Sequence, residues 1–325
     1  MAGYKFGNKA NFGENTTLSG SFQTVFGSGN SNSADYTMVG GISNTVVSTG
    51  EESLVWGSGN SVSGSNNAVF GSLHVMSNAA DNNIVGGLGC SGASTNTDYN
   101  ILVGYFCKST NKGNLTWGRN NINDIDVYGN GYHAVGGSGN TVSGSYFGMT
   151  IGEDNIGPLQ FESGLQFGKD GAAPENRVGA LSTSAGKFAA NGDAQLTTHL
   201  VYRGTTTDDT ATVIFQGGDS FRKYDLAAND SVIVKATVLG RKTGDAGQSV
   251  AYEVIAAFKR QGATSTIGTT GVTKRVLNED TGTTDYDATL AANDTADTFE
   301  LKVTGDTGHT VNWMANVEVL KLNVA

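Results

Sequence analysis

Four pairs of neighbouring carboxylates are the residues of this sequence best suited to catalysis. They are Glu51 with Glu52, Asp124 with Asp126, Glu153 with Asp154, and Asp208 with Asp209. Glycoside hydrolysis needs two carboxyl groups about 5 to 10 Å apart. Each pair lies in a hydrophilic, loop-like stretch, where side chains adjacent in sequence point apart more often than they converge. We therefore interpret all four as solvated turns and predict no catalytic residue, with a cleft between assembled subunits as the alternative that would make them useful.

His74, Cys90 and Cys107 are the other groups capable of chemistry. Two cysteines are too few for a disulfide framework or a four-ligand zinc site. All three residues fall where the repeat described below usually has Asn, so we interpret them as structural substitutes, although a disulfide between the two cysteines stays geometrically open. Glycine-rich stretches at 86–89 and 136–139 resemble calcium-binding nonapeptides but lack the required Asp, so we predict no calcium ladder, no metal-ligating residue and no cofactor, with a single ion held by loop carbonyls as the open alternative.

The overall composition limits the class of protein. The 325 residues include 47 glycines and only two prolines, which excludes collagen and indicates that glycine is a regular turn residue. The net charge of −10 argues against nucleic acid and anionic membranes as partners, because phosphate binding needs clustered Lys and Arg. No apolar run approaches the roughly 20 residues of a membrane span, and residues 1–5 do not open a signal segment, so we expect no membrane insertion and no signal-directed export.

A glycine that follows an apolar pair recurs through the first half of the sequence. These anchor glycines, spaced 14 to 19 residues apart, are Gly13, Gly27, Gly41, Gly57, Gly71, Gly87, Gly104, Gly118, Gly137 and Gly152. A period near 14 is too short for repeats of paired helices, and the β-branched and aromatic residues beside the glycines indicate short strands. Each repeat therefore predicts one coil of a β-solenoid. A solenoid this thin buries little apolar area alone, which favours oligomerisation.

Other residue types recur at fixed distances from the anchors. Three residues after an anchor stand the members of an Asn column: Asn30, Asn44, Asn60, Asn121, Asn140 and Asn155. Identical amides stacked in successive coils form hydrogen-bonded ladders, so we predict a structural role for this column. One residue before an anchor stand four aromatic side chains, which we expect to point into the core: Phe26, Trp56, Phe70 and Trp117.

The pattern Val-x-Gly-x-x-Asn-x-x-Ser over residues 11–157 resembles the head repeat of trimeric autotransporter adhesins. The resemblance implies a left-handed β-roll in which three chains pack side by side, and hence a homotrimer. The sequence shows no counterpart of that family's export signal, coiled-coil stalk or membrane barrel. This favours a bacteriophage fibre, a class that resembles the adhesins in using such rolls.

The anchor pattern stops after residue 157, and charged residues become denser. Residues 158–195 predict an ordered but irregular neck. Segments of alternating apolar and polar residues then predict a C-terminal β-sandwich or jelly roll over 196–325. Residues 1–10 are interpreted as an N-terminal attachment segment.

Four motifs in this second half are similar to a C-terminal module of phage tail and structural proteins. They are Gly-Asp-Ala-Gln at 192–195, Tyr-Arg-Gly-Thr-Thr-Thr at 202–207, Arg-Lys-Thr-Gly at 241–244 and Val-Asn-Trp-Met-Ala at 311–315. The resemblance implies a virion location, with other virion structural proteins as partners, and brings no catalytic residue. Trp313 lies within a predicted strand and is expected to be core.

The longest coil, between Gly118 and Gly137, carries an insertion rich in polar and aromatic residues. The residues that could bind a ligand there are Asp124, Asp126, Tyr128, Tyr132 and His133. Binding residues often lie on loops held by a rigid scaffold, and aromatic faces beside carboxylates suit sugar recognition. The sequence therefore predicts a lateral ligand site, with packing of the insertion on a neighbouring subunit as the alternative.

Together these observations predict an all-β, non-enzymatic, homotrimeric tail or head fibre of a virion that binds a host surface glycan or protein. Two alternatives remain: a structural head fibre or decoration protein without a specific receptor, and a polysaccharide-degrading tailspike.

Overall fold

Two compact units, residues 1–159 and 160–325, make up the computed structural model, and each is described by itself. The structure describes residues 9–77, 80–92, 98–110, 112–124, 132–143, 148–157, 161–162, 164–172, 177–244, 247–262, 267–283 and 285–323. Every regular element in these ranges is a β-strand, so this part of the chain is all-β. The same ranges contain no helix long and apolar enough to cross a membrane.

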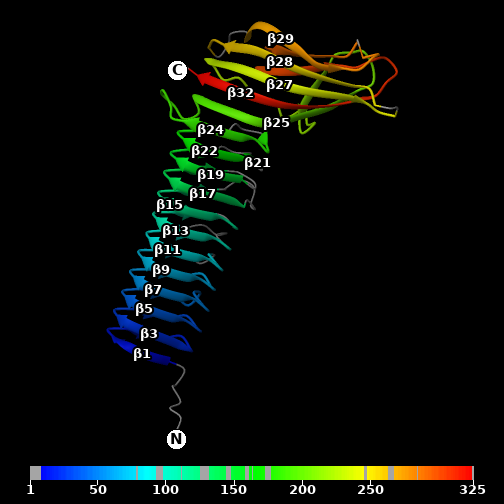
Figure 1. Cartoon of the computed structure of the whole chain (residues 1–325). Coiled ribbons are helices and arrows are strands. Elements are labelled where there is room, and N and C mark those ends of the chain that lie inside the picture. The colour runs from blue at the N-terminus through cyan, green and yellow to red at the C-terminus, as the bar shows by residue number, and fades with distance from the viewer. Residues whose placement is uncertain are drawn as a thin grey trace. The chain divides into compact units, whose positions relative to one another are not determined.

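The first unit is a β-solenoid in which long and short strands alternate. The long strands are β1 (Lys9–Glu14), β3 (Gln23–Ser28), β5 (Met38–Ile42), β7 (Leu54–Ser58), β9 (Ala68–Ser72), β11 (Ile84–Leu88), β13 (Ile101–Tyr105), β15 (Leu115–Arg119), β17 (His133–Ser138) and β19 (Gly148–Glu153). The short strands are β2 (Thr17–Leu18), β4 (Ser31–Asn32), β6 (Thr45–Val46), β8 (Ser61–Val62), β10 (Val75–Met76), β12 (Ser91–Gly92), β14 (Lys108–Ser109), β16 (Ile122–Asp124), β18 (Thr141–Ser143) and β20 (Ile156–Gly157). Figure 1 shows the long strands stacked in chain order.

Parallel pairing keeps equivalent residues of successive coils in register. Val39 pairs with Val25 on one side and with Val55 on the other, and the anchor glycines pair with one another in the same way. These valines lie two residues before the anchors and are completely buried. On the facing short strands Val46 and Val62 are buried as well, so the interior is one thin apolar layer between two parallel sheets.

The prediction that Phe26, Trp56, Phe70 and Trp117 point into this interior is wrong. Trp56 and Phe70 are 48% and 44% exposed, and the other two side chains are partly exposed. Successive residues of a strand face opposite sides, and the buried position is that of the valine one residue earlier. The aromatic side chains therefore lie on the outer face of the long strands.

The anchor glycines allow successive coils to approach closely. At Gly87, φ is +108°, and a Cβ atom would lie 2.0 Å from the carbonyl oxygen of Gly104 in the next coil. The same arrangement repeats from coil to coil. Glycine therefore recurs once in every coil because the backbone contact at this position leaves no room for a side chain.

Replacing Gly87 by Ala should destabilise the first unit by about 3 kcal/mol or more, since the change combines a backbone clash with an unfavourable φ. The adjacent Gly86→Ala is the matched control, because the nearest atom to its added Cβ would be 3.9 Å away. Thermal unfolding followed by circular dichroism compares the two. Equal melting temperatures would contradict this account of the anchors.

The second unit begins with further parallel strand pairs. β22 (Leu165–Lys169) pairs in parallel with β24 (Leu181–Ala185), and β21 (Phe161–Glu162) pairs in parallel with β23 (Arg177–Val178). Gly168 aligns with Ser184 and has φ of +113°, as an anchor would. The sequence predicts an irregular neck over 158–195, whereas the described part of this segment repeats the solenoid pattern. The signal is weak in the sequence because serine replaces the last anchor.

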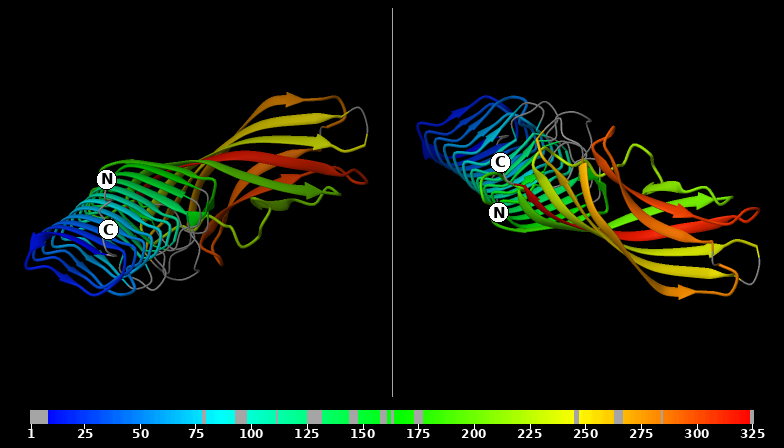
Figure 2. Two further views of the ribbon diagram at one scale, coloured as in Figure 1. Left: turned by 90° about the horizontal axis from the view of Figure 1, so that it is seen from below. Right: turned by 90° about the horizontal axis from the view of Figure 1, so that it is seen from above.

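Antiparallel strands form the rest of the second unit. They are β25 (Ala194–Thr206), β26 (Thr212–Gln216), β27 (Asp230–Lys242), β28 (Ser249–Arg260), β29 (Ile267–Glu279), β30 (Asp287–Asn293), β31 (Thr298–Thr304) and β32 (Val311–Asn323). One sheet has the order β25-β32-β27-β28-β29, and a second has the order β26-β31-β30. The end of β26 also pairs with β25, so the two sheets are connected at this edge. Figure 2 shows the long strands of the first of these sheets side by side.

A single core joins these two sheets. Phe258 of one sheet stacks on Phe299 of the other, with ring centroids 5.7 Å apart. Trp313 is 2% exposed, in agreement with its predicted position in the core, and Tyr286 meets it edge to face. Alternate residues of β27, β28 and β32 supply most of the remaining buried aliphatic side chains.

Candidate functional site

The residues of the predicted insertion site lie in different environments. Asp126 and Tyr128 are outside the described residues. Asp124 ends β16, where its carboxylate accepts a hydrogen bond from the hydroxyl of Thr110. Tyr132 is 57% exposed, whereas His133 begins β17 and is only 2% exposed. Of the described members, Tyr132 offers its ring to solvent and His133 belongs to the interior.

His133 is an interior residue because the repeat register resumes before the insertion ends. It lies four residues before its anchor, as Asn114 does in the previous coil. Its backbone N–H donates to Oδ1 of Asn114 over 3.1 Å, and its Nε2 lies 3.2 Å from the hydroxyl oxygen of Thr150. Burial lowers the pKa of His133 from 6.5 to about 4. The imidazole is therefore a neutral structural group, and it does not face a lateral surface site.

The Asn column forms a continuous hydrogen-bonded ladder where its members are adjacent. The Nδ2 of Asn60 donates to Oδ1 of Asn44 over 2.9 Å and to the carbonyl oxygen of Gly71 over 3.0 Å. Its own Oδ1 accepts the backbone N–H of His74. Asn140 and Asn155 repeat the amide-to-amide bond. Each buried amide is thus satisfied by the coils on either side, as buried polar groups require.

A second amide column was missed by the sequence reasoning. Its members stand four residues before the anchors: Asn67, Asn83, Asn100, Asn114 and His133. Here too each side-chain oxygen accepts the backbone N–H of the equivalent residue in the next coil, over 2.8 to 3.1 Å. The recurrence of Asn at this distance from the anchor was the available signal.

His74, Cys90 and Cys107 continue the Asn column as substitutes. The Nδ1 of His74 accepts the backbone N–H of Cys90 over 3.1 Å, and its Nε2 lies 3.1 Å from the carbonyl oxygen of Phe70. These two contacts fix the neutral tautomer with the proton on Nε2. Both cysteines are free, completely buried thiols, and the Sγ of Cys90 donates to the carbonyl oxygen of Gly104 in place of an amide.

Replacing Asn60 by Asp should weaken the first unit by about 3 kcal/mol, because a carboxylate cannot donate to Asn44 or to Gly71 and instead places a buried negative charge against their oxygen atoms. Asn66→Asp is the control, since Asn66 is an exposed residue of the neighbouring coil. Denaturant unfolding at neutral pH measures the difference. If both variants unfold at the same denaturant concentration, the ladder contributes nothing to stability.

The buried His133 should make the first unit sensitive to acid. Its native pKa is depressed, so between pH 6.5 and about 4 the unfolded chain takes up a proton that the native chain does not. The free energy of unfolding should therefore fall by up to about 3 kcal/mol as the pH drops through this window.

The variant His133→Asn supplies the residue that this column normally has and should remove that part of the acid sensitivity. His199→Asn is the control, because His199 is exposed and its φ of +61° suits Asn. Denaturant unfolding at about pH 7 and about pH 4.5 gives the comparison. An unchanged pH dependence in the His133 variant would assign the effect to other groups.

Three of the four carboxylate pairs considered for catalysis are exposed, and in the fourth Asp124 is partly buried in β16. Glu51 and Glu52 are exposed, and so are Asp208 and Asp209. Glu153 and Asp154 are exposed at the end of β19. Within the described ranges, His, Cys, Asp and Glu side chains form no group of three or more that could hold a metal ion.

Three of the four C-terminal motifs meet on neighbouring strands. Asn312 of β32 pairs with Thr205 of β25 on one side and with Arg241 of β27 on the other. The hydroxyl of Thr206 accepts the indole N–H of Trp313 over 2.9 Å. An open depression of about 520 Å³ lies beside these strands, lined by Arg203, Thr205, Phe215 and Asn312 among others.

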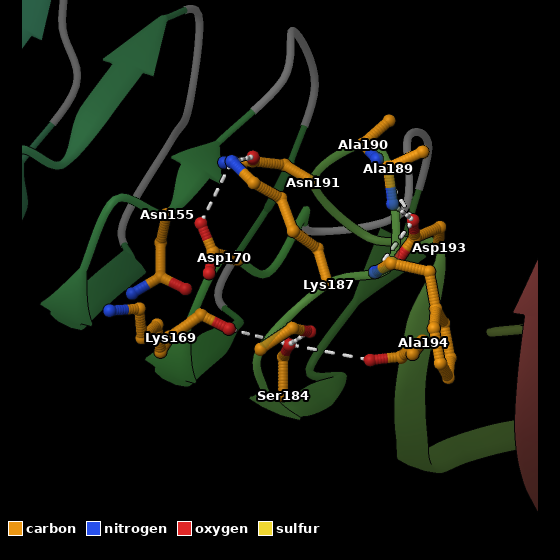
Figure 3. Close-up of polar contacts among 12 residues, drawn as sticks. Asn155, Lys169, Asp170, Ser184, Lys187, Ala189, Ala190, Asn191, Asp193 and Ala194 are labelled. Carbon is orange, nitrogen blue, oxygen red and sulfur yellow. Dashed lines mark hydrogen bonds and ion pairs between the residues drawn. The ribbon is translucent and has the colours of Figure 1, made fainter.

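The remaining motif closes a tight turn at the start of β25 (Figure 3). The carboxylate of Asp193 accepts the backbone N–H groups of Phe188, Ala189 and Ala190 over 2.6 to 3.1 Å. These backbone hydrogen bonds hold the pKa of Asp193 below its ordinary value. Beside it, Lys187 forms an ion pair of 3.0 Å with Asp170. The motif thus has a structural function, the ordering of residues 186–193.

The outer face of the long strands in the first unit is apolar. Ten large apolar side chains on it are each between 41% and 59% exposed: Phe12, Met38, Ile42, Trp56, Phe70, Ile84, Ile101, Val103, Tyr105 and Leu115. They extend over seven long strands, from β1 to β15. We call these ten residues the apolar face.

Comparison with known proteins finds no matching family model and no matching curated protein. Two solved structures are similar at a low level. The tailspike protein of Acinetobacter phage vB_ApiP_P1 has 8% sequence identity over 95% of this chain and 73% of its own, with a TM-score of 0.20. The tailspike protein of Acinetobacter baumannii phage AM24 has 10% identity over 97% of this chain and 57% of its own, with a TM-score of 0.23. Scores of this size carry no argument about function.

Proposed function

We propose that this protein is a non-enzymatic, homotrimeric fibre of a bacteriophage virion that attaches the particle to a bacterial surface glycan or protein. The single observation that supports this best is the apolar face of the solenoid. Virion origin is supported by the four C-terminal motifs, which are similar to those of phage tail and structural proteins. We also propose that the coils wind in a left-handed sense and that the two antiparallel sheets are a β-sandwich of the jelly-roll type.

The apolar face favours self-association for two physical reasons. Soluble monomers rarely expose a contiguous apolar patch larger than a few hundred Å². The interior of the solenoid is also thin, so much of the apolar surface of each coil is buried only if a partner covers the outer face of the long strands. Identical copies supply a matching surface, because the apolar face recurs on seven long strands and stays in register along the stack of coils.

Three copies also suit attachment. Linking three equal binding surfaces in one fibre raises the effective concentration for the second and third contacts, and thereby the avidity, with no change in any single contact. Attachment of this kind needs no catalytic group. It is consistent with the three carboxylate pairs that are exposed.

The variant Val103→Asp tests assembly and attachment together. Val103 lies on β13 within the apolar face, where a buried carboxylate would be costly in an assembled fibre. Ser61→Asp on the short strand β8 places the same charge away from that face. Light scattering should give three times the chain mass of 33.6 kDa for wild type and the Ser61 variant, and a lower mass for the Val103 variant.

Fluorescently labelled wild-type protein and both variants are then applied to a panel of bacterial strains. Strains that retain the wild type and the Ser61 variant should release the Val103 variant at least tenfold faster, because avidity is lost with assembly. A single-chain mass for the wild type in native buffer would overturn the trimer. Failure of a trimeric wild type to bind any strain, including the host of the phage that encodes it, would favour the structural head fibre or decoration protein.

A further inference from the structure

One edge of the solenoid carries a regular column of residues that neither the interior nor the apolar face uses. Its members stand five residues before the anchors, and we call them the edge column: Phe22, Tyr36, Glu52, Asn66, Asn82, Tyr99, Gly113 and Tyr132. The backbone N–H of Tyr36 donates to the carbonyl oxygen of Ser21, and that of Tyr99 donates to Asp81, each in the preceding coil. The column therefore advances by one residue per coil, about 4.8 Å each time.

Three of the four aromatic members of this column are strained and exposed at the same time. φ is +53° at Phe22, +55° at Tyr36 and +59° at Tyr99, a left-handed conformation that bulky residues rarely adopt. Asn66, Asn82 and Gly113, which tolerate it, occupy the same position in other coils. The three aromatic side chains are 52% to 66% exposed, so burial in this chain does not offset the strain. Strained residues of this kind gather at functional sites.

The rings are arranged as two platforms. Phe22 and Tyr36 stack with centroids 4.8 Å apart and an interplanar angle of 7°. The second platform consists of Tyr99 and Tyr132, with Gly113 between them in the column. The ring of Tyr132 lies over Gly113, where an added Cβ atom would come within 2.2 Å of the ring. Tyr36 and Tyr99 are four coils apart, or roughly 19 Å. Between the platforms stand only polar members, Glu52, Asn66 and Asn82.

Carboxylates accompany the platforms in fixed orientations. Asp35 precedes Tyr36 and accepts the backbone N–H of Ser21 over 2.5 Å. Asp98 precedes Tyr99, accepts the backbone N–H of Asp81 over 3.1 Å and forms an ion pair of 3.1 Å with Lys112. Each platform thus combines an exposed aromatic ring with an oriented carboxylate. An aromatic ring can stack on the C–H groups of a pyranose ring, and a carboxylate can accept hydrogen bonds from its hydroxyl groups.

We infer that the edge column is a glycan-binding surface that takes an extended, uncharged or amino-sugar polysaccharide running along the stack of coils. This deepens the proposed function, on which it rests, by naming the ligand class and its place. A polyanionic glycan is disfavoured by the carboxylates of Asp35 and Glu52, although Lys112 offsets the charge of Asp98. The polysaccharide must run along the stack of coils to reach both platforms, because they lie four coils apart in one column. The members of the column between them are polar and can contact the chain on the way.

The opposite edge provides the comparison that makes the inference testable. Two residues after the anchors, Leu73 also has a left-handed φ of +57° and is 59% exposed. Asn replaces any of these residues without strain, because it tolerates the conformation. The double variant Tyr36→Asn, Tyr99→Asn should therefore melt at the temperature of the wild type or higher, and Leu73→Asn is its matched control.

The probe is an immobilised panel of purified bacterial capsular polysaccharides and O-antigens, with binding of the full chain measured by interferometry. On the polysaccharides that the wild type binds, we expect the double variant to bind at least tenfold more weakly and Leu73→Asn to bind normally. Aromatic side chains at the centre of a recognition surface commonly contribute effects of this size.

Three outcomes would overturn the inference. Equal polysaccharide binding by the wild type and the double variant would place recognition elsewhere and leave the proposed function intact. Binding of the wild type to cells but to no polysaccharide would replace the glycan with a protein receptor. Loss of the assembled mass in the double variant would identify the edge column as a subunit contact. If the wild type binds neither cells nor polysaccharides, the proposed function itself fails.

Discussion

Close in-register stacking of the backbone is the constraint on which the solenoid depends. Each anchor carbonyl oxygen occupies the space that a Cβ atom of the preceding anchor would need, 1.7 to 2.0 Å from it in all nine coil-to-coil contacts from Gly13 to Gly152. Coils that approach in this way must place equivalent residues over one another. Every other column follows from that alignment, whether it is buried, polar or exposed.

Alignment also settles how a polar interior is tolerated. An amide above an amide can donate to one neighbour and accept from the other, so most amides of the two columns remain buried with their hydrogen bonds made, whereas Nδ2 of Asn100 has no acceptor among the described residues. Single residues of other types fit where they reproduce part of this pattern. His133 occupies an Asn position, where burial keeps its imidazole neutral. Cys90 occupies another, where its thiol donates a hydrogen bond to the carbonyl oxygen of the next anchor, Gly104. The buried columns thus account for the stability of the solenoid, and the outward-facing side chains between them are available for contacts with other molecules.

The sequence predicts the period, the β-solenoid and the Asn column, since all three depend on residue types at fixed distances from a glycine. It does not predict which neighbour of that glycine faces outward. Val55 and Trp56 are both apolar, and only the three-dimensional path of the strand shows that the valine is buried and the indole exposed. Register across an insertion is equally hard to predict: the sequence places His133 in the inserted loop, whereas in the structure the repeat has already resumed at this residue.

The C-terminal motifs illustrate a different limit. Residues at 202–207, 241–244 and 311–315 are far apart in sequence, and their common purpose is visible only once β25, β27 and β32 lie side by side. The sequence also gives no sign of the edge column, whose members share no chemical type. What all of them except Tyr132 share is a left-handed backbone conformation, which residues as different as Tyr36 and Gly113 can adopt at different conformational cost.

All three tryptophans of the chain lie against a glycine of the neighbouring strand. An added Cβ would come within 2.3 Å of Trp56 at Gly40, 2.1 Å of Trp117 at Gly136 and 2.4 Å of Trp313 at Gly240. The coil of Gly40 also separates Trp56 from Phe26, whose rings already have centroids 6.1 Å apart. Large rings also stand in direct succession elsewhere on this face, since Phe12 pairs with Phe26 and Trp56 with Phe70 in adjacent coils. A side chain introduced at Gly40 or Gly136 would therefore have to displace an indole that now covers the glycine.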